Sequence, residues 1–75
     1  MSLEPYITSR SSREQIMRVL KMIEILKKRK CIDRIELANM LGISYMRLNE
    51  YRRLARKLFG VDTYRHDLKI CIENT

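Results

Sequence analysis

The sequence predicts one small domain that is mainly α-helical and ends in a small β-hairpin, with three helices followed by two short strands. Two stretches, residues 11–30 and 45–59, repeat apolar residues at the three- and four-residue spacing of an α-helix. Residues 68–72 instead alternate apolar and polar side chains, which is the pattern of a β-strand. A length of 75 residues fits a single domain whose core is near the lower limit of self-sufficiency.

The first helix is predicted over residues 11–30. Ser11 and Glu14 have the spacing of a capping box, in which each side chain accepts a backbone N–H that the start of the helix leaves without a partner. The inward stripe of this helix consists of Ile16, Val19, Leu20, Ile23 and Leu26. Residues 1–10 show no periodicity, so we expect a tail there that is flexible or packs on a partner, followed by a domain over residues 11–75.

Three further apolar residues of the first helix, Met17, Met22 and Ile25, lie outside the inward stripe. The helix therefore has more apolar surface than one small core requires, and large exposed apolar patches are rare in monomers. We expect these three residues to contact a second copy of the chain in a homodimer, with cover by the N-terminal tail as the alternative.

A short second helix is predicted after Asp33 and ends at a glycine turn. Asp33 can cap its start, with Glu36 at the capping-box position, and Gly42 can adopt the positive φ that ends it. Ala38 is small enough for another helix to cross closely over it, and Ser44 can cap the helix that follows. The order of these residues predicts two helices joined by a tight turn.

The third helix, predicted over residues 44–59, divides into an apolar side and a cationic side. Its core-facing residues are Leu48, Tyr51, Leu54, Ala55, Leu58 and Phe59. Between Ser44 and Gly60 the chain has four arginines and one lysine against one glutamate, a net charge of +4 out of +7 for the whole chain. A solvated helix face normally mixes acids with bases, so this imbalance favours an anionic partner, although cations late in a helix also suit its dipole.

Two strands are predicted after the third helix, over residues 61–64 and 68–72, with the turn around residues 65–67. In the second strand the side chains that point to one side are Leu68, Ile70 and Ile72. His66 lies in the turn, where we expect a solvated side chain.

The stretch from Asp33 to Phe59 resembles the helix-turn-helix of winged-helix DNA-binding proteins, a family that includes small transcription regulators of archaeal and viral type. The resemblance rests on the small Ala38, the turn residue Gly42 and the cap Ser44. The apolar positions that complete the pattern are Leu37, Leu41, Ile43, Leu48, Leu54 and Leu58.

The resemblance implies a winged helix-turn-helix domain with three helices plus a two-stranded wing. Residues 44–59 would be the recognition helix in the major groove of double-stranded DNA, and residues 61–72 would place the wing at the phosphate backbone. It also implies that the link at Cys31 and Ile32 pairs with the last strand of the wing, which would bring Cys31 near Cys71.

Side chains on the exposed face of such a recognition helix read base edges, while flanking cations contact phosphates. By position, the residues expected at base edges are Tyr45, Met46, Asn49, Glu50 and Arg53. The residues expected at phosphates are Ser44, Arg47, Arg52, Arg56, Lys57 and Arg65. Arg53 could bind guanine through both ends of its guanidinium, and Asn49 could bind adenine through both ends of its amide.

The amino-acid composition limits the classes of partner that the chain is expected to bind. Sixteen lysines and arginines against nine acidic residues favour DNA, RNA or an anionic membrane surface, although solubility alone is a sufficient reason for a basic chain. No uncharged run approaches the ~20 residues of a membrane span, and the N-terminus lacks the pattern of a signal peptide. We therefore expect a cytoplasmic protein, intracellular and nucleoid-associated, with no membrane partner.

The sequence contains no pattern typical of a metal site or of a catalytic site. Cys31 and Cys71 lie far apart without a Cys/His ligand cluster, so we expect two reduced, partly buried thiols, with a disulfide between them as the alternative. Gly42 and Gly60 alone cannot form a phosphate-binding loop, and the lone His66 has no partner residue for catalysis. We expect no enzyme activity, no cofactor, no metal and no small-molecule ligand.

The sequence thus predicts sequence-specific binding of double-stranded DNA by a small transcription regulator, as a homodimer. Two alternatives stay open. One is a sequence-tolerant architectural or chromatin protein that also binds DNA, and the other is a winged-helix module that interacts with proteins.

Overall fold

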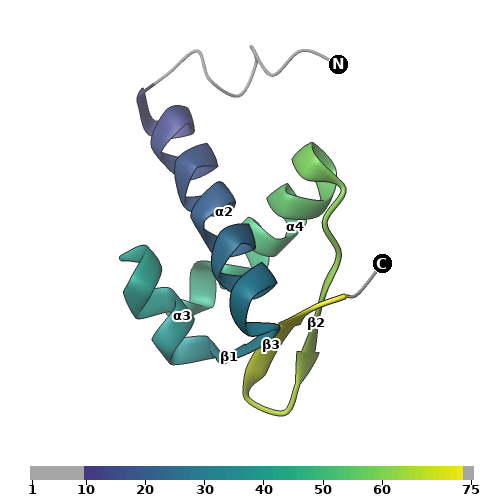
Figure 1. Cartoon of the computed structure of the whole chain (residues 1–75). Helices are drawn as coiled ribbons and strands as arrows, with labels where there is room; N and C mark the ends of the chain where they lie inside the picture. Colours follow the sequence, from purple (N-terminus) through teal and green to yellow (C-terminus); the bar gives the residue numbers. More distant parts are fainter. Residues whose placement is uncertain (1–9, 74–75) are drawn as a thin grey trace.

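A computed structural model describes residues 10–73 and folds them into a mainly helical domain with a small antiparallel sheet (Figure 1). Within these residues there are three α-helices, one 3₁₀ turn and three strands. In chain order they are α2 (Arg10–Arg29), β1 (Cys31–Asp33), α3 (Arg34–Leu41), η1 (Tyr45–Arg47), α4 (Leu48–Phe59), β2 (Thr63–His66) and β3 (Lys69–Ile72). The predicted tail over residues 1–10 lies almost entirely outside the described residues.

Helix α2 confirms the first predicted helix to within one residue at each end. It begins at Arg10, so Ser11 lies inside its first turn, and the Ser11 side chain of the predicted capping box lies outside the described residues. The helix ends where Lys30 adopts a left-handed φ of 63°. The N–H of Lys30 still donates to the carbonyl of Leu26 at 2.7 Å, which closes the last turn.

Asp33 and Gly42 cap the two ends of α3 as predicted. The carboxylate of Asp33 accepts the backbone N–H groups of Ile35 and Glu36 at 2.9 and 3.2 Å. Gly42 ends the helix with a φ of 70°, a conformation that glycine adopts at little cost. The Glu36 side chain does not complete the predicted capping box but accepts a hydrogen bond from Arg29 at 3.2 Å, which ties the start of α3 to the end of α2.

The third predicted helix is divided into two parts. Residues 45–47 form the 3₁₀ turn η1, because the N–H of Arg47 donates to the carbonyl of Ser44 three residues earlier, at 2.9 Å. The hydroxyl of Ser44 accepts the N–H of Met46 at 3.4 Å and caps this turn. The regular helix α4 then begins at Leu48 and ends at Phe59, and Gly60, whose φ is 67°, caps its end.

The sheet has three strands in the order β1–β3–β2, all antiparallel, where the sequence predicted a two-stranded hairpin. The third strand is β1, and its pairing with β3 matches what the family resemblance implied for the link after α2. The hairpin of β2 and β3 turns at Asp67 and Leu68 rather than around residues 65–67. Asp67 can occupy the turn because aspartate tolerates the left-handed conformation, here a φ of 59°.

A disulfide joins Cys31 of β1 to Cys71 of β3, so the expectation of two reduced thiols is wrong. The two residues are direct partners in the antiparallel register, with their Cα atoms 4.0 Å apart. This proximity depends on the pairing of strands that lie 40 residues apart in the chain, which no local sequence pattern reports.

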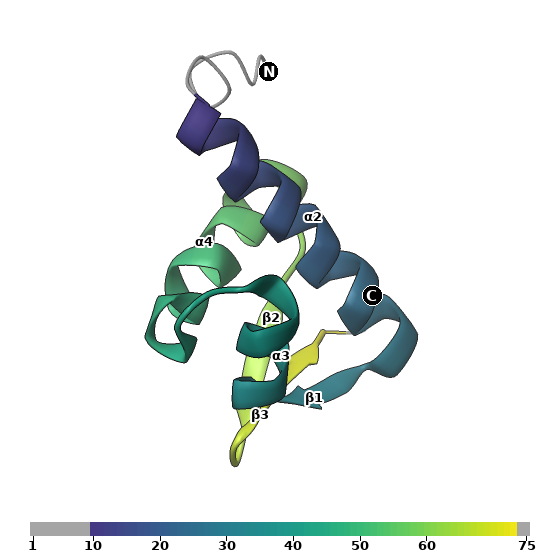
Figure 2. The same cartoon turned by 90° about the vertical axis from the view of Figure 1, so that its left-hand side faces the viewer.

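The core lies between the three helices and the inner strands. Helix α2 packs against α4, α3, β1 and β3, and every one of these elements contributes buried apolar side chains. Tyr51 of α4 is the largest fully buried side chain. The start of α2 and the hairpin turn lie at opposite ends of the molecule, and two views at right angles agree on this (Figures 1 and 2).

Residues 10–73 form neither a membrane-spanning helix nor a cluster of metal ligands. None of their helices has the length and apolar character that crossing a membrane requires. Likewise, no group of three or more His, Cys, Asp or Glu side chains comes together within them to hold a metal ion.

Candidate nucleic-acid interface

The outer face of η1 and α4 exposes all five residues that the sequence predicts at base edges. We call this surface the outer face and define it by Tyr45, Met46, Asn49, Glu50 and Arg53. Met46 has 74% of its surface exposed, which is high for a large apolar side chain. Because so exposed an apolar side chain is not stabilised by packing in the core, Met46 is available for contact with a partner.

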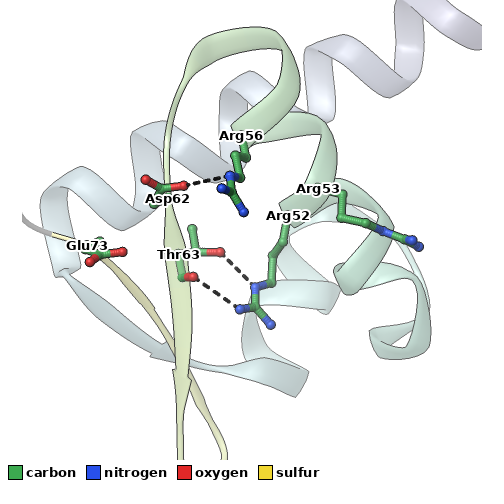
Figure 3. A pocket seen from close by; sticks show the side chains of 6 residues that line it. All are labelled: Arg52, Arg53, Arg56, Asp62, Thr63 and Glu73. Atoms are coloured by element: carbon green, nitrogen blue, oxygen red, sulfur yellow. Dashed lines mark hydrogen bonds and ion pairs between the residues drawn. The ribbon is translucent and has the colours of Figure 1, made fainter.

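Arg53 is the cation of the outer face, and its side chain is exposed. It projects away from β2, whereas Arg52 and Arg56 project toward that strand and the residue before it (Figure 3). Arg53 makes no hydrogen bond or ion pair with any described residue. Its guanidinium therefore has all its donors free for an external acceptor.

Arg52, predicted to contact phosphate, is half-buried and makes its hydrogen bonds within the chain. Its Nε donates to the hydroxyl of Thr63 at 2.8 Å, and one terminal nitrogen donates to the Thr63 carbonyl at 3.3 Å (Figure 3). The other terminal nitrogen donates to Oδ1 of Asn49 at 3.2 Å. Burial, and then the nearby charge of Arg65, lower the pKa of Arg52. An arginine in this setting joins α4 to β2 rather than reaching outward.

The remaining predicted phosphate contacts are exposed, and most have a neighbour within the chain. Arg56 pairs with Asp62 at 3.3 Å, and Arg47 pairs with Glu50 at 3.7 Å. Arg65 donates to the carbonyl of Asp67 at 3.1 Å. Exposed ion pairs of this kind contribute little to stability, so these cations can exchange partners at small cost. Lys57 is also exposed.

Glu50 takes part in a contact between helices. Its carboxylate accepts the side-chain amide of Gln15 at 2.8 Å, which links α4 to the first half of α2. Together with the Arg47 pair, this bond gives Glu50 a role within the chain that the helical pattern could not indicate. The residue stays exposed, but its oxygens already have two partners.

Arg34, which the sequence analysis missed, lies beside the outer face. Its guanidinium carbon is 4.6 Å from the centre of the Tyr45 ring, within the range of a cation–π contact. Both residues line a cavity of about 230 Å³ that also includes Asn49 and Arg65. Arg34 belongs to α3, so no periodicity within α4 could have identified it. Only the turn at Gly42, which folds α3 against η1, brings it to this surface.

A separate apolar groove of about 560 Å³ runs between α2 and the end of α3. Its apolar lining consists of Met17, Leu20, Ile25 and Leu41, and its charged lining consists of Arg18, Lys21 and Glu24. Of the three residues predicted to contact a second copy, only Met17 is well exposed, at 66%. Met22 is 0% exposed and Ile25 is 9% exposed, because both fill the core of this chain. Leu20, predicted to face the core, is 42% exposed and lines the groove beside Met17.

Comparison with known proteins gave no match: no family model matches the chain, and neither a curated protein nor a solved structure resembles it significantly.

Proposed function

We propose that the chain is a winged helix-turn-helix protein that binds double-stranded DNA in a sequence-specific manner as a small transcription regulator. The outer face of η1 and α4 would enter the major groove, and the β2–β3 hairpin, as the wing, would lie along the phosphate backbone. The observation that carries the proposal is the exposed outer face, which no other described element covers and which the exposed cations Arg47, Arg56 and Lys57 flank. A B-form major groove admits one α-helix with its side chains directed at base edges.

The residues of the outer face and the cations around it have two different roles in the proposal. Tyr45, Met46, Asn49 and Arg53 are free to approach base edges, with Arg53 suited to guanine. The residues assigned to phosphates are Arg34, Arg47, Arg56, Lys57 and Arg65. Arg34 and Arg65 line the same cavity from different elements, so one phosphate group could contact both.

Binding to duplexes in a salt titration tests the proposal, with Arg53→Ala as the key variant and Lys27→Ala as the matched control. Lys27→Ala removes the same charge from the exposed end of α2. We expect Arg53→Ala to lose about 1–3 kcal/mol of discrimination at one base pair and Lys27→Ala to lose none. A chain that binds no duplex even at low salt would refute the proposal. Equal affinity for all duplexes would instead support an architectural DNA-binding protein.

The proposal includes a homodimer in which a second copy covers the apolar groove. The exposed Met17 and Leu20 gain from burial, and the rim of the groove carries both signs of charge. Two copies of α2 related by a twofold axis would place Glu24 of each copy near Lys21 of the other, which makes the surface complementary to itself. A dimer would also fit DNA sites with two half-sites about one helical turn apart.

A further inference from the structure

Three hydrogen bonds connect the β2–β3 hairpin to a side chain of the outer face through one residue. Arg52 donates twice to Thr63 of β2 and once to Asn49, which lies one turn earlier in α4. Thr63 is in turn paired with Ile72 across the hairpin. The guanidinium is planar and rigid, so these donors occupy fixed relative positions.

We propose that Arg52 is a positioning residue that sets the orientation of the Asn49 amide and makes it depend on the position of the hairpin. This inference rests on the proposed function, because its consequence is the choice of base at the position that Asn49 reads.

The chemistry of the two groups determines which end of the amide faces Arg52. A guanidinium has only donors, so it can be satisfied by the amide oxygen of Asn49 and would repel the amide NH₂ group. The 3.2 Å contact to Oδ1 therefore fixes the amide against a flip. In an isolated helix the exposed Asn49 could present either end of its amide with similar ease.

A fixed amide presents its NH₂ donors outward and keeps one lone pair of Oδ1 available. In the major groove, N7 of adenine accepts such a donor while N6 of adenine donates to the oxygen, so an asparagine in this orientation selects adenine. Loss of the Arg52 contact frees the amide to rotate, and a rotating amide accepts other bases. Arg52 would thus act on specificity without touching DNA.

The bond from Arg52 to Thr63, which ties Arg52 to the hairpin, can be tested in the free protein by measuring exchange of arginine Nε–H protons with water by NMR. Arg53 is the control within the same helix, because it has no partner among the described residues. We expect the Arg52 proton to exchange at least about tenfold more slowly than the Arg53 proton. Thr63→Val removes the hydroxyl acceptor without changing any charge and should abolish this difference, whereas Thr63→Ser should retain it. Equal exchange of both protons in the wild-type chain would refute the inference, whether or not the protein binds DNA.

The consequence for recognition can be tested by selecting bound duplexes from a random pool. We expect Thr63→Val and Arg52→Lys to lower the preference for adenine at one position by about tenfold, with the salt slope of binding unchanged. Thr63→Ser should behave as the wild type. Thermal unfolding of each variant verifies that it is folded.

The experiments distinguish a failure of this inference from a failure of the proposed function. If Arg52 contacted phosphate instead, Arg52→Gln would flatten the salt slope by about 0.9, weaken every duplex equally, and leave Thr63→Val without effect, which would overturn the inference. If the wild-type chain bound no duplex, the reading role would fall together with the proposed function. Slow exchange of the Arg52 Nε–H proton would then still establish its bond to Thr63.

Discussion

Lys30 adopts a backbone conformation that costs a lysine free energy. Its φ of 63° lies in the left-handed region, where the Cβ atom of any residue other than glycine meets the following carbonyl. The conformation persists because Lys30 ends α2 and its carbonyl accepts the N–H of Ile72 at 2.8 Å, which starts the pairing of β1 with β3. The residue thus carries strain at the junction between the helical layer and the sheet.

Lys30→Gly should therefore raise the free energy of unfolding by up to about 1 kcal/mol, because glycine adopts the left-handed conformation without this strain. Chemical denaturation monitored by circular dichroism measures the change. Lys27→Gly is the control: it removes the same charge but places glycine inside α2, so it should lower the free energy of unfolding by about 1 kcal/mol. A stability loss in both variants would contradict the prediction.

Single residues also show where prediction from sequence succeeds and where it fails. Asp33, Gly42 and Ser44 were predicted because a cap or a turn depends on neighbours within a few positions of the chain. The roles of Arg52 and Arg34 could not be predicted, because their partners Thr63 and Tyr45 are eleven residues away in the chain and on another element. A helical wheel reports which side a residue occupies, but it does not report what approaches that side.

At the scale of elements, periodicity located the helices but not every boundary or every pairing. The periodicity over residues 45–59 predicts one continuous helix, yet its first three residues form η1, and 3₁₀ turns are frequent at the start of an α-helix. The strand β1 has only three residues, too few for an alternating pattern, so only the family resemblance pointed to its pairing. Met22 lies outside the inward stripe of the wheel, yet it is fully buried among the core side chains.

The exposed apolar side of α2 leads to a prediction about dimerisation. Met17→Gln should weaken dimerisation at least about tenfold, because burial of a methionine side chain contributes about 1.5–3 kcal/mol. Sedimentation equilibrium over a range of protein concentrations measures the dissociation constant. Met46→Gln is the matched control, since Met46 is a methionine of similar exposure on the outer face of η1 and α4. A wild-type chain that stays monomeric at all concentrations would show that the groove serves another purpose.

At the scale of the whole molecule, the disulfide joins the strand that follows α2 to the last strand of the described fold. Cys31 follows α2, and Cys71 lies in the central strand of the sheet, so the bond encloses α3, α4 and β2 in one covalent loop. A domain of this size buries a limited core, and its net stability is on the order of 4–11 kcal/mol. A covalent link across the sheet is therefore a large fraction of what holds the fold together.

Reduction of the disulfide should lower the free energy of unfolding by about 3–4 kcal/mol, because a bond that closes a loop of 40 residues restricts the unfolded chain by roughly that amount. Denaturation with and without a reductant measures the loss. The double variant Cys31→Ala, Cys71→Ala is the control, because it should start at the lower stability and show no response to the reductant. Since the loop includes Thr63 and the whole of α4, the reduced chain should also hold the Arg52 contacts less firmly, and its Arg52 Nε–H should exchange faster. An unfolding midpoint that the reductant leaves unchanged in the wild-type chain would show that the two thiols are free in solution.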